Sequence, residues 1–248
     1  MLHIATHNGV FHADEVTAIA LLKVFIESEL QVTRVPHNQQ NFDSFDMVID
    51  IGKRLDKKRY FDHHQYKGGK SSAGLIWEYI GLEKEYKDIS KLVKIIDEQD
   101  TGVKKAQPFE YPNLIKCFNQ SDIYSQKQEE AFFQAVEFAV VTFSSLKRVA
   151  QERKKAKEIV KNSFMFEGST TVLELAEFTP HWQAYVEENI PHIKAVVWED
   201  EVQQKYKIKT ASKHIILPQS KKMEFIHSAG FFGVAKSRED MLQYVRCL

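Results

Sequence analysis

The seven residues 46–52 (DMVIDIG) constrain the fold of this chain more than any other segment. They form a short, continuous apolar run that is ended by aspartate and glycine. Strands that are buried on both faces of a parallel sheet have such runs, whereas strands of half-exposed sheets alternate apolar and polar residues. We therefore expect a central parallel strand here. Parallel neighbours need long crossover connections, which are usually helices.

Segments of strand and helix character do alternate along the first half of the chain. Asp14 stands where a helix N-cap is favoured, and residues 67–70 (KGGK) predict a flexible link. The alternation predicts an α/β domain with a largely parallel sheet. Further strands are expected at residues 2–6, 31–35 and 59–61, and helices at residues 14–26, 71–80 and 89–97.

The second half of the chain has a different pattern. Residues 129–162 contain apolar residues at helical spacing and predict one or two long helices. The basic cluster at 147–161 includes glutamates, which favours a solvated helix face over a nucleic-acid groove. Short strands of a separate sheet are expected at residues 172–175, 195–198 and 206–209. We predict an α/β domain over residues 1–125, a helical connector over 126–167 and a smaller α+β domain over 168–248.

The composition is that of an ordinary globular protein. Hydrophobic residues make up 43% of the chain, and 34 basic residues balance 34 acidic ones, so no overall field attracts a polyanion. Cys117 and Cys247 lie far apart, which argues against a disulfide framework and a zinc knuckle. The N-terminus lacks the pattern of a signal peptide, and no apolar run approaches the roughly 20 residues of a membrane span. We expect a cytoplasmic protein without membrane contact.

Histidines and carboxylates follow the predicted strands where each strand ends. His7 follows the first strand, Asp50 ends the third, and residues 62–64 (DHH) follow the fourth. The carboxyl ends of parallel strands meet at one edge, where such sheets bind ligands. Imidazole and carboxylate groups without thiolates suit divalent ions such as manganese, zinc and iron. The sequence therefore predicts a metal site, with further candidate ligands at His12, Asp14, Glu15, Asp97 and Asp100.

Each of these residues also has an ordinary structural interpretation. His7 and Asp50 are common turn residues, and Asp97 could be exposed to solvent. Neighbouring side chains of an extended segment point to opposite faces, so His63 and His64 can contact different ligands. The gathering of six or seven potential ligands at the ends of successive elements favours the metal site.

The ordered motifs resemble those of the DHH phosphoesterase superfamily, which includes RecJ-type exonucleases, oligoribonucleases and family II inorganic pyrophosphatases. Within it, residues 6–15 (THNGVFHADE), 59–65 (RYFDHHQ) and 71–75 (SSAGL) resemble the melanocyte-proliferating-gene-one family of metal-dependent hydrolases. Residues 217–218 and 225–231 (FIHSAGF) resemble its C-terminal signature, so the resemblance covers nearly the whole chain. His12 replaces the first aspartate of the superfamily's first motif, as is usual in this branch.

The resemblance implies a site for two divalent ions, with Mn²⁺ expected and Mg²⁺ or others as alternatives. Asp50 would bridge the two ions, and Asp97 would support the site rather than bind metal. Asp62 would orient an imidazole, and His64 would contact the scissile phosphate. One ion would be held by His7, His12 and Asp50, and the other by Asp14, Asp50, His63 and Asp100.

Substrate contacts are expected in two places. Ser71, Ser72 and Gly74 begin a helix near the site, where amides can bind phosphate, although N-capping by a serine is an equal alternative. In the C-terminal domain, the expected contacts are His227, Ser228 and Gly230, with a core strand and turn as the alternative.

The implied activity is two-metal hydrolysis of phosphodiester bonds, as an exonuclease on RNA or short oligonucleotides. Two alternatives stay open: a hydrolase of pyrophosphate or nucleotides, and a metal-binding scaffold without turnover. A homodimer is a further arrangement that the sequence leaves open.

Overall fold

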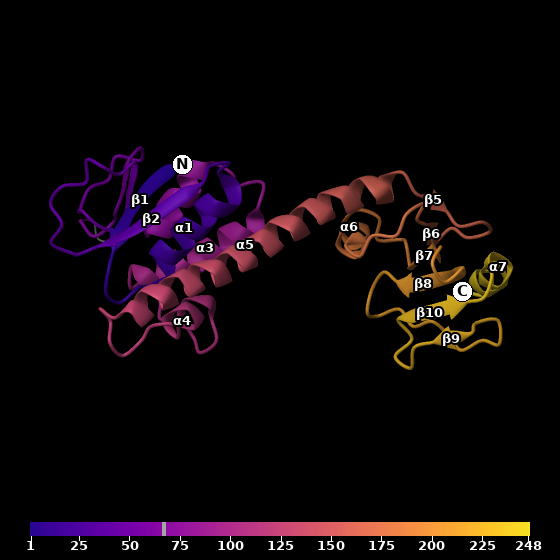
Figure 1. Ribbon diagram of the computed structural model, residues 1–248. Coiled ribbons are helices and arrows are strands. Elements are labelled where there is room, and N and C mark those ends of the chain that lie inside the picture. Colours follow the sequence, from indigo (N-terminus) through magenta and orange to yellow (C-terminus); the bar gives the residue numbers. More distant parts are fainter. Residues whose placement is uncertain (66–67) are drawn as a thin grey trace. The chain divides into compact units, whose positions relative to one another are not determined.

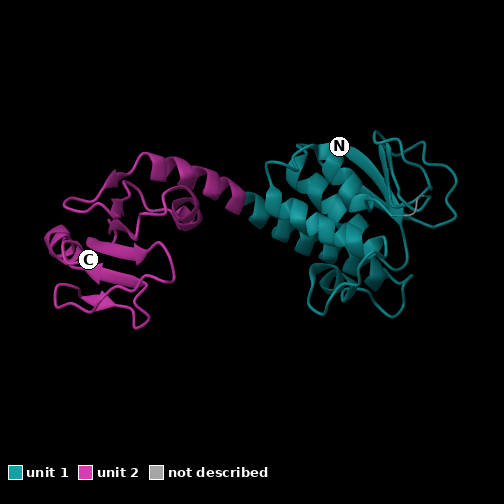
Figure 2. Cartoon of the chain, turned by 180° about the vertical axis from the view of Figure 1, so that it is seen from behind, with its two compact units in different colours: residues 1–148 teal, residues 149–248 magenta. Residues whose placement is uncertain are grey.

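The computed structural model describes residues 1–65 and 68–248 (Figure 1). Lys67, in the predicted flexible link, lies outside the described residues. The chain divides into two compact units, unit 1 (residues 1–148) and unit 2 (residues 149–248), shown in Figure 2. The division falls within α5 (Gln126–Lys161), a single helix where the sequence predicts one or two. The predicted three-part domain division stays a prediction.

Unit 1 contains a parallel sheet with the strand order β2-β1-β3-β4. Its strands are β1 (Leu2–His7), β2 (Leu30–Val35), β3 (Met47–Ile49) and β4 (Tyr60–Phe61). The predicted central strand is confirmed but shorter, because Asp50 turns the chain with a left-handed φ of 56°. The α/β class with a parallel sheet is confirmed.

In the described residues of unit 1, four helices precede α5. They are α1 (Ala13–Phe25), α2 (Ser72–Ile80), α3 (Lys87–Asp100) and α4 (Tyr111–Lys116), and α1 contacts the other three. The prediction that Asp14 caps α1 is wrong, because His12 is the N-cap residue. The Glu15 carboxylate accepts a hydrogen bond from the His12 amide at 3.0 Å, and Asp14 is left fully buried in the first turn.

The central strand β3 of the sheet in unit 1 is fully buried. Ala5, Val48 and Tyr60 form one cluster with Phe42 and Phe45 of the segment between β2 and β3. The alternate residues of these strands point to the opposite face, where α2 contacts β4. Burial on both faces explains why β3 (Met47–Ile49) is continuously apolar, and it leaves the end of this strand as the place for a polar side chain.

Unit 2 contains a mixed sheet with the strand order β5-β6-β7-β8-β10-β9. Val197 packs in a cluster with Met241 of α7, and Val196 packs in another with Trp182 of α6, so each face has its own core. The predicted second sheet is confirmed. Its elements are β5 (Phe164–Met165), β6 (Val172–Glu174), α6 (Trp182–Asn189), β7 (Ala195–Asp200), β8 (Lys205–Thr210), β9 (Phe225–Ile226), β10 (Phe232–Ala235) and α7 (Arg238–Val245).

Among the described residues of both units, no helix is both long enough and apolar enough to cross a bilayer. Even in α5, with 36 residues, the longest stretch without a charged side chain is the nine residues 138–146.

Candidate active site

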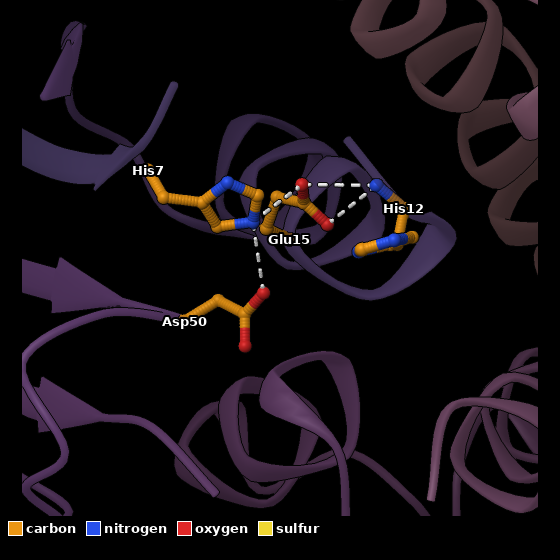
Figure 3. A group of neighbouring side chains, drawn as sticks. All are labelled: His7, His12, Glu15 and Asp50. Carbon is orange, nitrogen blue, oxygen red and sulfur yellow. Dashed lines mark hydrogen bonds and ion pairs between the residues drawn. The ribbon is translucent and has the colours of Figure 1, made fainter. Parts of the chain in front are cut away.

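β1 ends at His7 and brings it into the centre of a polar cluster, from which a loop leads to α1 (Figure 3). Nδ1 of His7 lies 2.9 Å from the carbonyl oxygen of Asn8, which leaves Nε2 directed into the cluster. Nε2 lies 3.1 Å from Oε1 of Glu15 and 3.3 Å from Oδ2 of Asp50. Contacts at both ring nitrogens therefore fix the orientation of the imidazole in the folded chain.

Two side chains fix the backbone of this loop. The Arg34 guanidinium, which is fully buried, donates to the carbonyl oxygens of His7 at 3.1 Å and Gly9 at 2.8 Å, and it pairs with Glu129 at 2.8 Å. Gln128 donates a second hydrogen bond to the Gly9 carbonyl at 2.8 Å. Arg34 thus connects β2, the loop after β1 and α5. These contacts hold the loop in place.

Asp50 lies between two imidazoles and presents a different oxygen to each. Oδ2 faces His7, and Oδ1 lies 3.4 Å from Nε2 of His63. The Ser72 hydroxyl also donates to Oδ1 at 3.1 Å. Asp50 is only 3% exposed and has a left-handed backbone conformation, which is uncommon for a non-glycine residue and is concentrated at functional sites.

His63 faces a second group of carboxylates. Its Nε2 lies 2.9 Å from Oδ2 of Asp100 and 3.7 Å from Oδ2 of Asp14. Asp14 is fully buried, and among the described residues neither of its carboxylate oxygens has a hydrogen-bond partner. A buried carboxylate without a partner is energetically costly, and a bound cation would remove that cost.

The pKa values of these groups show how closely the charges are packed. Burial lowers the pKa of His7, but hydrogen bonds to Asp50 and Glu15 outweigh this effect and raise the pKa to about 11. Burial likewise lowers the pKa of His63, and its bonds to Asp100 and Asp50 raise it to about 10. Burial and the negative charges of its neighbours hold the pKa of Asp14 well above its usual range. The cluster thus concentrates negative charge around Asp14.

The side chains fit a site for divalent cations. Three groups each present ligand atoms that lie within 4.8 Å of one another: His7, His12, Glu15 and Asp50; Asp50, His63 and His64; and His12, Asp14 and Asp100. Asp50 belongs to the first two groups and His12 to the first and third. Oxygen and imidazole ligands without thiolates suit Mn²⁺ and related ions.

Glu15 was a candidate ligand from the sequence, but the family resemblance gave it no place in the set of ligands for either ion. The signal was its position three residues after the N-cap, which brings its carboxylate back over His12. Asp97 does not belong to the three groups, and its Oδ1 accepts hydrogen bonds from the Ser71 amide at 2.9 Å and hydroxyl at 2.7 Å.

His64, which belongs to the second of these groups, also pairs with Asp62. Nδ1 of His64 lies 2.9 Å from Oδ1 of Asp62, and this hydrogen bond raises the pKa of His64. The other oxygen of Asp62 accepts a hydrogen bond from the Lys53 amide at 2.7 Å. About half of the His64 side chain is exposed, at 54%, so the imidazole is oriented but accessible.

The predicted phosphate-binding helix start is already occupied by a carboxylate. Asp97 accepts from Ser71, and a Cβ atom added to Gly74 would overlap the Asp97 carboxylate. The Ser72 hydroxyl donates to Asp50 and to the Phe61 carbonyl. A phosphate would compete with Asp97 for these donors, and the substrate-binding role of Ser71, Ser72 and Gly74 stays a prediction.

The other predicted substrate contacts belong to unit 2, in the turn between β9 and β10. The Ala229 amide donates to Nδ1 of His227 at 3.1 Å, and the Gly230 amide donates to the His227 carbonyl at 2.7 Å. Gly230 has a left-handed φ of 67° and packs against Ile216. The roles of His227, Ser228 and Gly230 in binding stay predictions.

A cavity of about 560 Å³ opens onto the cluster in unit 1. The residues that line it include His37, Lys53, Arg54 and Tyr124, to which the sequence analysis gave no role. The His37 ring stacks on that of His7, with ring centroids 4.7 Å apart. The volume lies within the range of roughly 300–1,000 Å³ that is typical of small-ligand sites.

Comparison with known proteins places this site in a family. The sequence profile of the MYG1_exonuc family, described as "Uncharacterised protein family (UPF0160)", matches residues 3–216. The chain belongs to this family. The resemblance to the melanocyte-proliferating-gene-one family is thereby confirmed, and the matched segment includes every proposed residue of the cluster in unit 1.

Several MYG1_exonuc relatives are similar over different lengths. A MYG1 protein of Chlamydia trachomatis is 36% identical over 64% of this chain and 58% of its own length. A MYG1 protein of Saccharomyces cerevisiae is 25% identical over 98% of this chain and 94% of its own. The human MYG1 exonuclease is 34% identical over 46% of this chain and 33% of its own. The chain thus spans less than two thirds of the Chlamydia relative that it matches.

Among solved structures, that of RecJ in complex with Mg²⁺ from Thermus thermophilus aligns over 99% of this chain and 49% of that chain. The TM-score is 0.30 and the sequence identity is 12%.

Proposed function

We propose that this chain is a metal-dependent phosphodiesterase that acts on short single-stranded oligonucleotides, RNA in particular. The arrangement around Asp50 is the main support for this proposal. Its two carboxylate oxygens face two different imidazoles, and the buried Asp14 beside His63 has both oxygens without hydrogen-bond partners among the described residues. A carboxylate in this position is suited to bridge two cations.

The first proposed ligand set is one of the three groups of the structure, and the second joins His63 with the three carboxylates that approach its Nε2. Asp50 is shared, and Asp100 is preferred to Asp97 because Asp100 approaches Nε2 of His63. Bound Mn²⁺ or a similar ion would lower the pKa of a water molecule and stabilise negative charge on a phosphoryl group. We assign His7, His12, Glu15 and Asp50 to one ion, and Asp14, Asp50, His63 and Asp100 to the other.

His64 is the proposed proton donor to the leaving oxygen. Its Nδ1 is bonded to Asp62, so the ring is fixed with Nε2 on the opposite side. The exposed imidazole lines the cavity, where a phosphodiester would lie. An acidic partner that raises the pKa of His64 keeps the ring protonated nearer to neutral pH, as a general acid requires.

Hydrolysis of two substrates tests the proposal. The full chain is incubated with Mn²⁺ and either bis-p-nitrophenyl phosphate or a short oligoribonucleotide, and products are followed by absorbance and chromatography. We expect hydrolysis of both substrates, loss of both activities in Asp50→Asn, and no change in Asp43→Asn, an exposed carboxylate outside the cluster. No product with either substrate at full metal occupancy would overturn the proposal, whereas turnover of pyrophosphate alone would redirect it to small phosphoesters.

A further inference from the structure

We propose that unit 1 contains its own nucleotide-recognition subsite, in which Tyr124 stacks on a base and Lys53 and Arg54 hold a phosphate next to the scissile one. The subsite lines the same cavity as His64 and Asp50. This inference rests on the proposed function and deepens it. It identifies the substrate as a single-stranded chain with at least one base and a second phosphate.

Tyr124 is a large aromatic residue in an unusual position. Its side chain is in the cavity lining, yet the residue is 72% exposed. A Cβ atom added to Gly9 would lie 3.6 Å from Cε1 of Tyr124, so the ring approaches the loop between His7 and His12. An exposed ring beside a metal and phosphate site can stack with any base, because every base has a π face.

Lys53 and Arg54 lie on the loop between β3 and β4, and both are exposed. The Asp62 carboxylate accepts from the Lys53 amide at 2.7 Å, and the Asp62 amide donates to the Arg54 carbonyl at 3.2 Å. The same carboxylate orients His64. One residue therefore fixes both the proposed proton donor and the backbone of the two cations.

The Arg54 guanidinium rests on the Tyr60 ring, with Cζ 4.2 Å from the ring centroid. This contact restricts the long side chain while leaving its donors available at the cavity. Because the chain has no net charge, capture of a polyanion depends on such local cations. Phosphate groups are the ligands that paired lysine and arginine side chains recognise most readily.

The stacking contact is tested with a pair of substrates in the presence of Mn²⁺. One is a short oligoribonucleotide, and the other has the same length and phosphates but abasic residues. Tyr124→Ala should lower kcat/KM on the first by roughly 5- to 100-fold, mainly through KM, and should have little further effect on the second. Tyr124→Phe should retain the wild-type preference for bases.

Phe109→Ala is the matched control, because Phe109 is an aromatic residue that is 87% exposed and is not part of the cavity lining. If Tyr124→Ala fails to fold, Tyr124→Leu replaces it. Equal losses on both substrates, or no loss on either, would overturn the stacking role.

The phosphate contacts are tested by salt dependence. For a single strand, each neutralised phosphate contributes a slope of about −0.7 to a plot of log affinity against log salt concentration. Lys53→Ala and Arg54→Ala should each make the slope of log(kcat/KM) shallower by about 0.7, whereas Lys58→Ala, an exposed lysine of the same loop outside the cavity, should not.

Unchanged slopes in both variants would refute the phosphate contacts. These outcomes are distinct from failure of the proposed function, in which the wild-type chain itself hydrolyses neither bis-p-nitrophenyl phosphate nor the oligonucleotide.

Discussion

Replacing Asp14 by asparagine should change stability in opposite directions with and without metal. Asp14 is fully buried, its carboxylate oxygens lack hydrogen-bond partners among the described residues, and Asp50, Glu15 and Asp100 add negative charge around it. Without a cation, the ionised carboxylate therefore opposes folding. With a cation, the same carboxylate becomes a ligand.

The sign and size follow from this environment. The pKa of Asp14 is higher in the folded chain than in the unfolded chain. At a pH above the ordinary pKa of aspartate, ionisation of Asp14 therefore lowers the free energy of unfolding. Asn keeps the shape, removes the charge and supplies amide donors to the neighbouring carboxylates. Relief of a buried unpaired group is worth about 1–3 kcal/mol. At about 2–4 °C per kcal/mol for a chain of this size, Asp14→Asn should raise the metal-free Tm by roughly 2–12 °C.

Metal should reverse the order. A ligand at about 1,000 times its Kd stabilises the folded chain by about 4.1 kcal/mol, which exceeds the about 1–3 kcal/mol that the ionised Asp14 costs without metal. Wild type should therefore show a large rise in Tm with Mn²⁺, whereas Asp14→Asn, which lacks one ligand, should show a smaller one. At saturating Mn²⁺ for wild type, the wild-type chain should be the more stable of the two.

Differential scanning calorimetry in EDTA and across a Mn²⁺ series measures both effects. Asp43→Asn controls for loss of one negative charge, because Asp43 is exposed and lies outside the cluster. The reasoning is refuted if Asp14→Asn lowers the metal-free Tm, or if its Mn²⁺-dependent rise equals that of wild type.

Three further substitutions probe the site. Asp62→Asn weakens the orientation of His64, so kcat on bis-p-nitrophenyl phosphate should fall about 10- to 100-fold, with metal content by mass spectrometry unchanged. Arg34→Ala removes the donors to the His7 loop and should cost about 1–3 kcal/mol in urea unfolding; an unchanged midpoint would contradict this role. Gly74→Ala forces a Cβ atom onto the Asp97 carboxylate and should lower the free energy of unfolding by about 1–3 kcal/mol in the same assay. An unchanged free energy of unfolding would show that Asp97 and the start of α2 can move to make room for the Cβ atom.

The sheet of unit 1 and the polar cluster could largely be predicted, because the sequence shows both the strands and the residues at which they end. The apolar run before Asp50 is typical of a buried parallel strand, and the confirmed parallel register brings the ends of β1, β3 and β4 to one edge. That edge is where His7, Asp50 and His63 meet. The cap of α1 was predicted wrongly, because the pattern could not show that Glu15 would bond to the His12 amide and leave Asp14 for the interior.

The rest of the cavity could not be predicted, because it depends on irregular loops. Lys53 has a left-handed φ of 50°, a conformation that lysine does not favour. In this conformation its amide donates a hydrogen bond to Asp62. Tyr124 reaches Gly9 from more than a hundred residues along the chain. His37 stacks on His7 from a loop without periodicity. Such contacts arise from tertiary packing and leave little local signal.

The shared role of Asp50 is the central claim, and anomalous diffraction from crystals grown with Mn²⁺ tests it most directly. We predict two anomalous peaks, one beside each carboxylate oxygen of Asp50, with His7 next to one and His63 next to the other. Strong anomalous density elsewhere in the crystal, with none at Asp50, would contradict the account.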